Sequence, residues 1–361
     1  MTTRVVERMG GRRWMVHLIR IVIVTAVAAV VIWRVNWSSA RLFVHPSSWG
    51  YLLLAIVANF ISVGFKGVVW KEIIDGLPGL RHRTRYRDLM PPVFIGFLFN
   101  TVLAARLGEL VKVALARRRL VARGEDISAT ALLGTIVAEN LIGTLMWVVL
   151  VIGIGMFLPL PLYAWIASLA IGAVAALIVG YAMLTATGHQ PLPWLSHGSW
   201  FAKAVRAASR LWGAVRESHL VLRSPSRFAM VGGASLFTWF AQWAGIYCTL
   251  QAFGLGYVGW GGAGLLLVTI TLAQAFPLLP GNLIIFQAAA VVPLTATYGV
   301  PASQAIAFSI VLQFTEIIVG VLTGFIFLLF EGVSFGQLRR EAEAEAVELE
   351  SDGRETAAAT D

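Results

Sequence analysis

The chain contains a series of apolar runs that approach the length needed to cross a lipid bilayer. A spanning helix needs about 20 apolar residues, because the hydrocarbon core is about 30 Å thick and an α-helix rises 1.5 Å per residue. Only 13% of the residues are charged, against about 25% in soluble domains. The sequence therefore predicts an all-α, polytopic membrane protein. The six runs are Val16–Trp33, Trp49–Trp70, Thr130–Leu158, Leu162–Leu184, Phe228–Phe253 and Ala302–Phe330.

Two further apolar regions, Leu89–Ala116 and Val258–Tyr298, are interrupted by polar residues, proline or glycine. Basic clusters flank the first region on both sides, so we expect it to enter and leave on one face as a re-entrant pair of half-helices. By the same reasoning the second region enters from the opposite face, although its length would also allow two full spans. The expected fold is six full spans plus two re-entrant helical hairpins.

Basic residues outside the spans predict the orientation, because cytoplasmic loops carry an excess of Lys and Arg. Counting them places both termini in the cytoplasm of a multi-pass cell-membrane protein. The residues assigned to the cytoplasm are Arg4, Arg8, Arg12, Arg13, Lys71, Arg81, Arg83, Arg85, Arg87, Arg117, Arg118, Arg119 and Arg123.

The order of these segments indicates an internal repeat. Residues 49–158 and 226–330 each read as helix, hairpin, helix, and their first helices run in opposite directions. An inverted repeat with broken helices is typical of transporters. A span at 162–184 and a cytoplasmic amphipathic helix at 200–222 link the halves. Residues 1–340 thus form one transmembrane domain, and residues 341–361, with eight acids and one arginine, form an acidic tail predicted to be disordered.

Three charged residues, Arg106, Glu109 and Lys112, lie inside the first interrupted region. A charge at the bilayer centre costs about 2.5–3.5 kcal/mol, so it usually faces protein or water and marks a substrate path. A half-helix that begins near Arg106 favours an anion through its free amides and its dipole. Glu109 would orient Arg106, and Lys112 would be a second phosphate contact or a snorkelling cation. The alternative is that all three lie at the cytoplasmic interface and obey the positive-inside rule.

Other polar residues in the apolar segments extend this predicted site. Glu139 needs a buried partner such as Arg106 or Lys112, either in the site or in a structural salt bridge. Gln313 and Glu316, one helical turn apart, could face the same cavity or join helices by hydrogen bonds. We expect Lys66 to snorkel. The predicted substrate-binding set is Asn100, Arg106, Gly108, Glu109, Lys112, Glu139, Asn140, Pro280, Gly281, Asn282, Gln287, Gln313 and Glu316.

The composition argues against several other functions. The single cysteine, Cys248, excludes a disulfide framework, and the six histidines show no ligand spacing, so we expect no metal and no cofactor. The basic residues lie beside apolar spans, where anionic lipid headgroups explain them better than nucleic acid does.

Two segments carry a family resemblance. NTVLAARLGELVKVALARR, from Asn100, and LLPGNLIIFQAAAV, from Leu278, resemble two motifs of the lysylphosphatidylglycerol synthase transmembrane region, a flippase-like family. The resemblance spans roughly Trp49 to Phe330, and Arg106, Gly108, Glu109, Pro280 and Gly281 fall on motif residues. The chain departs from the family pattern at Ala104, Lys112, Asn140, Asn282, Ile284 and Gln287.

The resemblance implies movement of aminoacylated phospholipids or lipid-linked intermediates across a membrane, here without a soluble synthetase domain. We therefore expect a non-enzymatic lipid translocase whose partner is a membrane lipid with an anionic headgroup. Charge lost at Asn140 and Gln287 leaves open a non-transporting partner of a lipid or cell-envelope biosynthetic enzyme. A membrane glycosyltransferase is the weaker alternative, because the outer loops carry no carboxylate that could act as a base. The sequence does not determine the oligomeric state.

Overall fold

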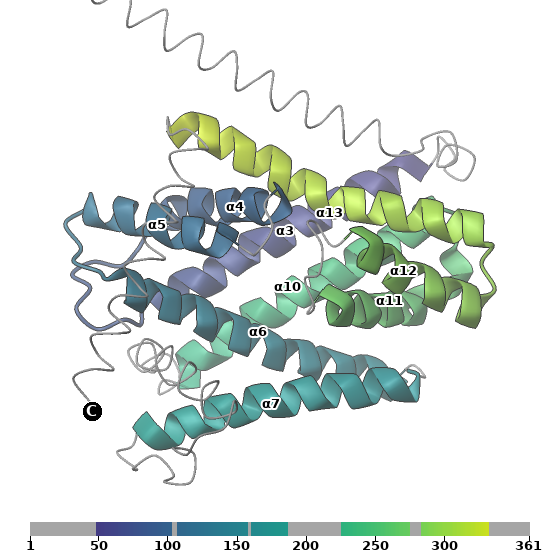
Figure 1. The fold of residues 1–361 in the computed structure, drawn as a ribbon, viewed down its shortest axis with the longest axis horizontal. Coiled ribbons are helices and arrows are strands. Elements are labelled where there is room, and N and C mark those ends of the chain that lie inside the picture. Colours follow the sequence, from purple (N-terminus) through teal and green to yellow (C-terminus); the bar gives the residue numbers. More distant parts are fainter. Residues whose placement is uncertain (1–47, 103–106, 158–159, 187–224, 275–282, 332–361) are drawn as a thin grey trace, which may run out of the picture.

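The computed structural model describes residues 48–102, 107–157, 160–186, 225–274 and 283–331 (Figure 1). All regular structure within these ranges is helical. The expected first span at 16–33, the amphipathic helix at 200–222, the acidic tail and the breaks of both hairpins lie outside the described residues.

The helices fall into two length classes. The long ones have 25–30 residues, or about 37–45 Å, and are α3 (Trp49–Ile74), α6 (Ala129–Phe157), α7 (Leu162–Ala186), α10 (Pro225–Ala252) and α13 (Ala302–Glu331). The short ones have 15–17 residues, or about 22–26 Å, and are α4 (Tyr86–Val102), α5 (Leu107–Val121), α11 (Gly259–Gln274) and α12 (Leu283–Tyr298). A 3-10 turn, η3 (Gly256–Val258), precedes α11.

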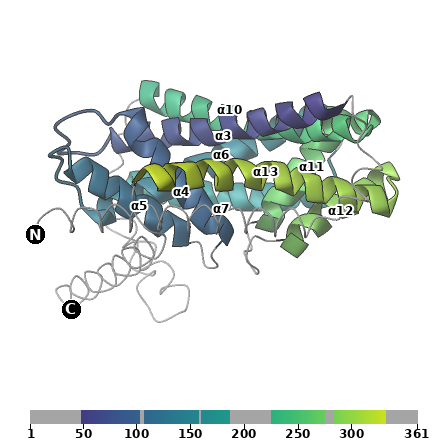
Figure 2. The ribbon, with the colours of Figure 1, turned by 90° about the horizontal axis from the view of Figure 1, so that it is seen from above.

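The short helices form two hairpins at opposite ends of the bundle. Figures 1 and 2 show the long helices running along most of its length, with α4 and α5 at one end and α11 and α12 at the other. The order long helix, hairpin, long helix therefore occurs twice, as α3 to α6 and as α10 to α13. In the first hairpin α4 ends at Val102 and α5 begins at Leu107, and in the second α11 ends at Gln274 and α12 begins at Leu283, so the described helices flank the positions where breaks are expected.

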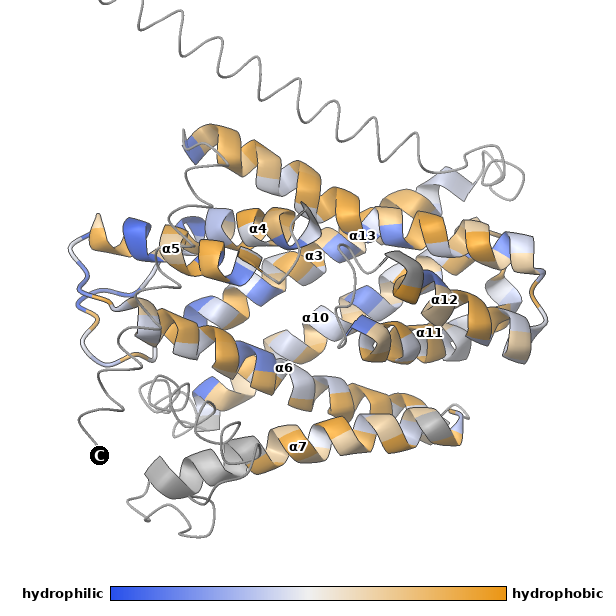
Figure 3. Cartoon of the chain, in the orientation of Figure 1, coloured by the Kyte–Doolittle hydropathy of each residue, from blue (hydrophilic) through white to orange (hydrophobic). Residues whose placement is uncertain are grey.

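Several helices have the length and hydropathy of membrane spans. Within the described ranges these are Trp49–Ile74, Ala129–Met156, Gly256–Gln274 and Ala302–Glu331. Large apolar side chains such as Met156, Leu177 and Leu53 are exposed along the long helices, and Figure 3 shows that hydrophobic residues predominate in these helices. The molecule is therefore a multi-pass helical membrane protein. The segment Gly256–Gln274, expected as half of a hairpin, is itself apolar enough for a span, yet α11 occupies only one end of the bundle.

Helix contacts place the two hairpins against the long helices of the other half. α3 packs along α10 at the centre, α4 packs against α13, and α11 contacts α6. Glycine permits the closest approaches. A Cβ on Gly108 would overlap the Gly96 carbonyl oxygen of α4, and a Cβ on Gly324 of α13 would overlap the Phe94 carbonyl oxygen. These glycines allow α5 to pack closely against α4, and α4 to pack closely against α13.

Candidate functional site: a polar cavity halfway along the bundle

Lys112 on α5 is a buried cation that two carboxylates and an indole ring surround. Its Nζ lies 2.7 Å from Glu139 Oε2 of α6 and 4.0 Å from Glu109 Oε2. The ammonium also lies 4.2 Å from the centroid of the Trp70 ring. The structure thus pairs Glu139 with Lys112, one of the two partners predicted for Glu139 from the sequence. A buried pair of this kind is stable only when both members are present.

Trp70 is itself fixed in place. The ring is fully buried, and its Nε1 donates to Thr135 Oγ1 at 2.8 Å, while Thr135 donates to the Leu132 carbonyl oxygen. The position of the ring beneath Lys112 is therefore set by α6. Helices α3, α5 and α6 meet at this one cation.

Asn100 holds the start of α5 against α4. Its Oδ1 accepts from the Gly108 backbone N–H at 2.9 Å, and its Nδ2 lies 3.3 Å from Glu109 Oε1. The first N–H groups of a helix lack partners within it, so Asn100 satisfies one of them across the hairpin. Gly108 is required because a Cβ there would lie 2.5 Å from Asn100 Oδ1. The Asn100, Gly108 and Glu109 combination thus has a local structural role.

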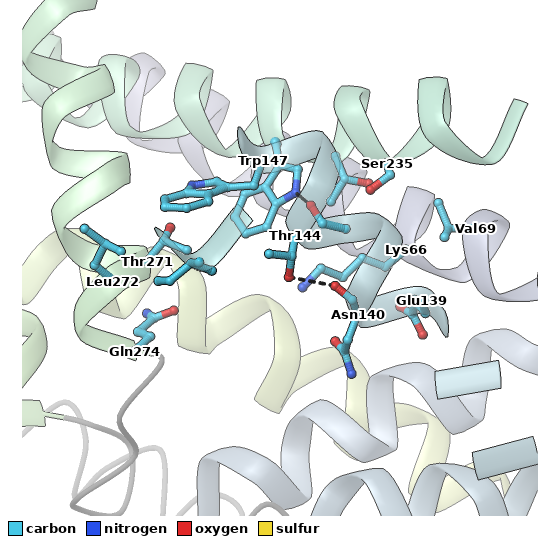
Figure 4. A pocket seen from close by; sticks show the side chains of 14 residues that line it. Lys66, Val69, Glu139, Asn140, Thr144, Trp147, Ser235, Thr271, Leu272 and Gln274 are labelled. Atoms are coloured by element: carbon cyan, nitrogen blue, oxygen red, sulfur yellow. Dashed lines mark hydrogen bonds between the residues drawn. The ribbon is translucent and has the colours of Figure 1, made fainter. Parts of the chain in front are cut away.

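A cavity of about 270 Å³ opens beside this cluster (Figure 4). Glu139 belongs to both the Lys112 cluster and the cavity wall, because it pairs with Lys112 and also lines the cavity. Side chains of five helices form the wall: Lys66, Val69, Glu139, Asn140, Gly143, Thr144, Trp147, Ile171, Ser235, Thr238, Trp239, Thr271, Leu272 and Gln274.

The cavity lies away from the ends of α3 and α6, two of the long helices that line it. Lys66 is about 12 Å from the end of α3, and Glu139 is about 15 Å from the start of α6, at 1.5 Å per residue. Thr271 and Gln274 lie in the last turn of α11, about 18–22 Å from the start of that helix. The cavity therefore lies beside the C-terminal end of α11.

Lys66 is the functional candidate that the sequence prediction missed. It is half-buried, and Figure 4 shows its side chain reaching toward Thr144 and Asn140 across the cavity. Among the described residues no carboxylate lies within 4 Å of its Nζ, although Glu139, Glu109 and Glu316 act on it at longer range. The Phe97 ring lies 5.2 Å from the ammonium. The position of Lys66 near a helix end suggested snorkelling. The cavity beside Lys66 could not be inferred from the sequence, because it forms between helices that are far apart in the chain.

Polar residues of the second half form a separate layer next to the cavity. Gln287 Nε2 donates to Gln313 Oε1 at 2.7 Å, which joins α12 to α13. Glu316 accepts a hydrogen bond from Gln274, a residue of the cavity wall. Gln313 and Glu316 therefore act between helices, and Glu316 reaches the cavity through Gln274.

The predicted site is brought together in part. Asn100, Gly108, Glu109, Lys112 and Glu139 form one cluster, and Asn140 lines the adjoining cavity. The described part of this cluster and of its surroundings holds two ammonium groups, Lys66 and Lys112, and three carboxylates, Glu109, Glu139 and Glu316. Four predicted residues lie outside the described ranges: Arg106, Pro280, Gly281 and Asn282.

The fold and this cavity define a helical membrane protein with two hairpins and an internal polar site. Residues 17–324 match the family described as lysylphosphatidylglycerol synthase TM region, and the chain belongs to that family. The resemblance seen in the two motifs is thereby confirmed, and the match begins earlier, within the first apolar run. Comparison with curated proteins and with solved structures gave no match.

Proposed function

We propose that this protein is a lipid translocase of the cell membrane, and that the cavity beside Lys66 receives the phosphate headgroup of its lipid substrate. The observation that carries the proposal is a lysine without a close carboxylate partner among the described residues, facing a cavity beside the C-terminal end of α11. An ammonium group on a flexible stem is a common ligand for phosphate.

The helix contacts support an inverted repeat. If α3, α4, α5 and α6 are matched with α10, α11, α12 and α13, each contact has a counterpart. The contact of α4 with α13 corresponds to that of α11 with α6, and α3 with α13 corresponds to α10 with α6. The remaining pairs, α3 with α4, α4 with α5, α5 with α6 and α3 with α6, are matched by α10 with α11, α11 with α12, α12 with α13 and α10 with α13.

This arrangement suggests how the headgroup would move. In transporters built from inverted repeats, the substrate site lies between the repeats near mid-membrane, and rocking of one repeat against the other exposes it to either side. The headgroup would bind at Lys66, and Arg106, which lies outside the described residues, is the expected second cation. The lipid tails would stay in the bilayer, and no covalent bond would change, so the protein would not be an enzyme. Both termini would face the cytoplasm.

Vesicles test the proposal. Purified protein in liposomes should accelerate exchange between leaflets of labelled lipids with a phosphate headgroup. Lys66→Met should reduce the rate at least about tenfold, since a charged hydrogen bond contributes about 1.5–3 kcal/mol and 1.4 kcal/mol is a factor of ten. Lys71→Met is the matched control, because Lys71 is on the same helix but is paired with Glu72 and Asp75 outside the cavity.

One result would count against the role of the cavity, and another would count against translocation itself. Equal exchange in wild type and Lys66→Met would remove the headgroup role of the cavity. No acceleration with any phospholipid or polyprenyl-phosphate lipid would favour the second candidate, a membrane partner of a lipid or cell-envelope biosynthetic enzyme. The neutral Gln287–Gln313 pair, where a charged residue would match the family motif, is the observation that supports this candidate.

A further inference from the structure

A second cavity, of about 340 Å³, lies at the end of the bundle where α4 begins and α5 ends. We call it the arginine groove. It is separate from the central cavity, since the two share no lining residue. Its lining residues are His82, Arg83, Thr84, Arg85, Leu120, Arg123 and Glu125.

The one carboxylate in the arginine groove is already engaged. Glu125 accepts from the backbone N–H groups of Arg81 and His82 at 2.8 and 3.0 Å. Arg123 pairs with Asp88. Arg83 and Arg85, in contrast, are exposed, and within the described ranges no carboxylate lies within 4 Å of either. The groove therefore presents two unneutralised guanidinium groups.

The chain itself carries a complementary segment that starts close by. Glu331, the last described residue of α13, pairs with Arg119, one helical turn before Arg123 of the groove. Residues 341–361 carry a net charge of −7, and three of their acids, Glu341, Glu343 and Glu345, lie within five residues. Ten residues of fully extended chain span at most about 33–36 Å. Because Glu331 pairs with Arg119, one helical turn from Arg123 of the groove, this length allows Glu341 to reach the groove.

We propose that the acidic segment 341–361 docks in the arginine groove. Its carboxylates bind Arg83 and Arg85, and guanidinium groups favour such paired contacts. Attachment through a short linker gives a local concentration on the order of millimolar, which compensates for the weakness of exposed ion pairs. The docked segment would cover the cations that otherwise face the anionic lipid surface. This inference does not depend on the proposed lipid transport.

Cross-linking of the full chain tests the docking. In a Cys248→Ala background, His82→Cys and Glu345→Cys place one thiol in the groove and one in the segment. With the protein in vesicles of neutral phosphatidylcholine at low salt, a short bismaleimide should join them. Arg83→Glu with Arg85→Glu should lower the yield at least about fivefold, and adding Glu341→Lys with Glu343→Lys should restore it. The matched control is Arg87→Glu with Arg118→Glu, the same charge change at exposed residues outside the groove.

Each outcome decides the proposal. Loss of cross-linking in the groove variant alone, with recovery on charge exchange, supports it. An equal loss in groove and control variants shows only general attraction and overturns it. Absence of cross-linking, combined with loss of binding to anionic vesicles in the groove variant, would assign the groove to lipid headgroups instead. Tail variants with Glu341, Glu343 and Glu350 changed to Gln test the same point if the groove variants fail to fold.

Discussion

Removal of the Lys112 charge should destabilise the protein more than removal of either of its carboxylate partners. The Lys112 and Glu139 side chains are only 9% and 12% exposed. Lys112→Met would leave Glu139 and the nearby Glu109 without their cation. Breaking a buried pair from one side costs about 3–5 kcal/mol.

Glu139→Gln should cost less, because Lys112 keeps Glu109 at 4.0 Å and the Trp70 ring at 4.2 Å. We expect about 1.5–3 kcal/mol, the contribution of a hydrogen bond to a charged group. The double variant Lys112→Met with Glu139→Gln removes both charges of the pair, so neither member is left buried without the other. The loss should therefore fall below the sum of the two single losses by about 1–3 kcal/mol.

Thermal unfolding in lipid nanodiscs measures these differences. At about 2–4 °C per kcal/mol, Lys112→Met should lower the Tm by roughly 6–20 °C. Lys71→Met is the control and should lower it less, because the Lys71 side chain is 19% exposed and Asp75 keeps two hydrogen bonds from Thr84 when the cation is removed. The account of this cluster is wrong if Lys112→Met costs no more than Lys71→Met, or if the single losses simply add.

Two further predictions concern packing and pH. Gly108→Ala should lower the Tm by separating α4 from α5 at Gly96, at a cost of about 1–3 kcal/mol, whereas Gly153→Ala, where a Cβ meets nothing within 4 Å, should be neutral or stabilising. The Arg81 backbone N–H lowers the pKa of Glu125, so ionised Glu125 stabilises the fold above its unfolded pKa of about 4.3. The Tm advantage of wild type over Glu125→Gln should be full above that pH and vanish as pH falls through the folded pKa; a constant difference across this window would contradict the assignment.

The sequence predicted much of the architecture because apolar length and charge clusters are local signals. Runs near 20 residues indicated the long helices, and the arginines on both sides of Leu89–Ala116 indicated a hairpin. Pro280 and Gly281 predicted an interruption in the second hairpin, and the helices on either side of them end at Gln274 and begin at Leu283. The helix–hairpin–helix order in both halves follows from these signals alone.

The central cavity could not be predicted in the same way. It exists because α3, α6, α7, α10 and α11 leave space between side chains that are far apart in the sequence, such as Lys66 and Thr271. Hydropathy assigns Lys66 to a helix end, and only the packing of α6 and α10 shows that it faces an internal space. Likewise, Asn100 matched a motif, but its contact with the Gly108 N–H depends on the angle between α4 and α5.

The central claim is that the cavity beside Lys66 holds a lipid headgroup, and native mass spectrometry of the purified protein tests it most directly. Wild type and Lys71→Met should retain a bound lipid with a phosphate headgroup, and Lys66→Met should lose it while keeping its Tm within a few degrees. Retention of the same lipid at the same occupancy in Lys66→Met, or absence of bound lipid from the wild type under the same conditions, would contradict the claim.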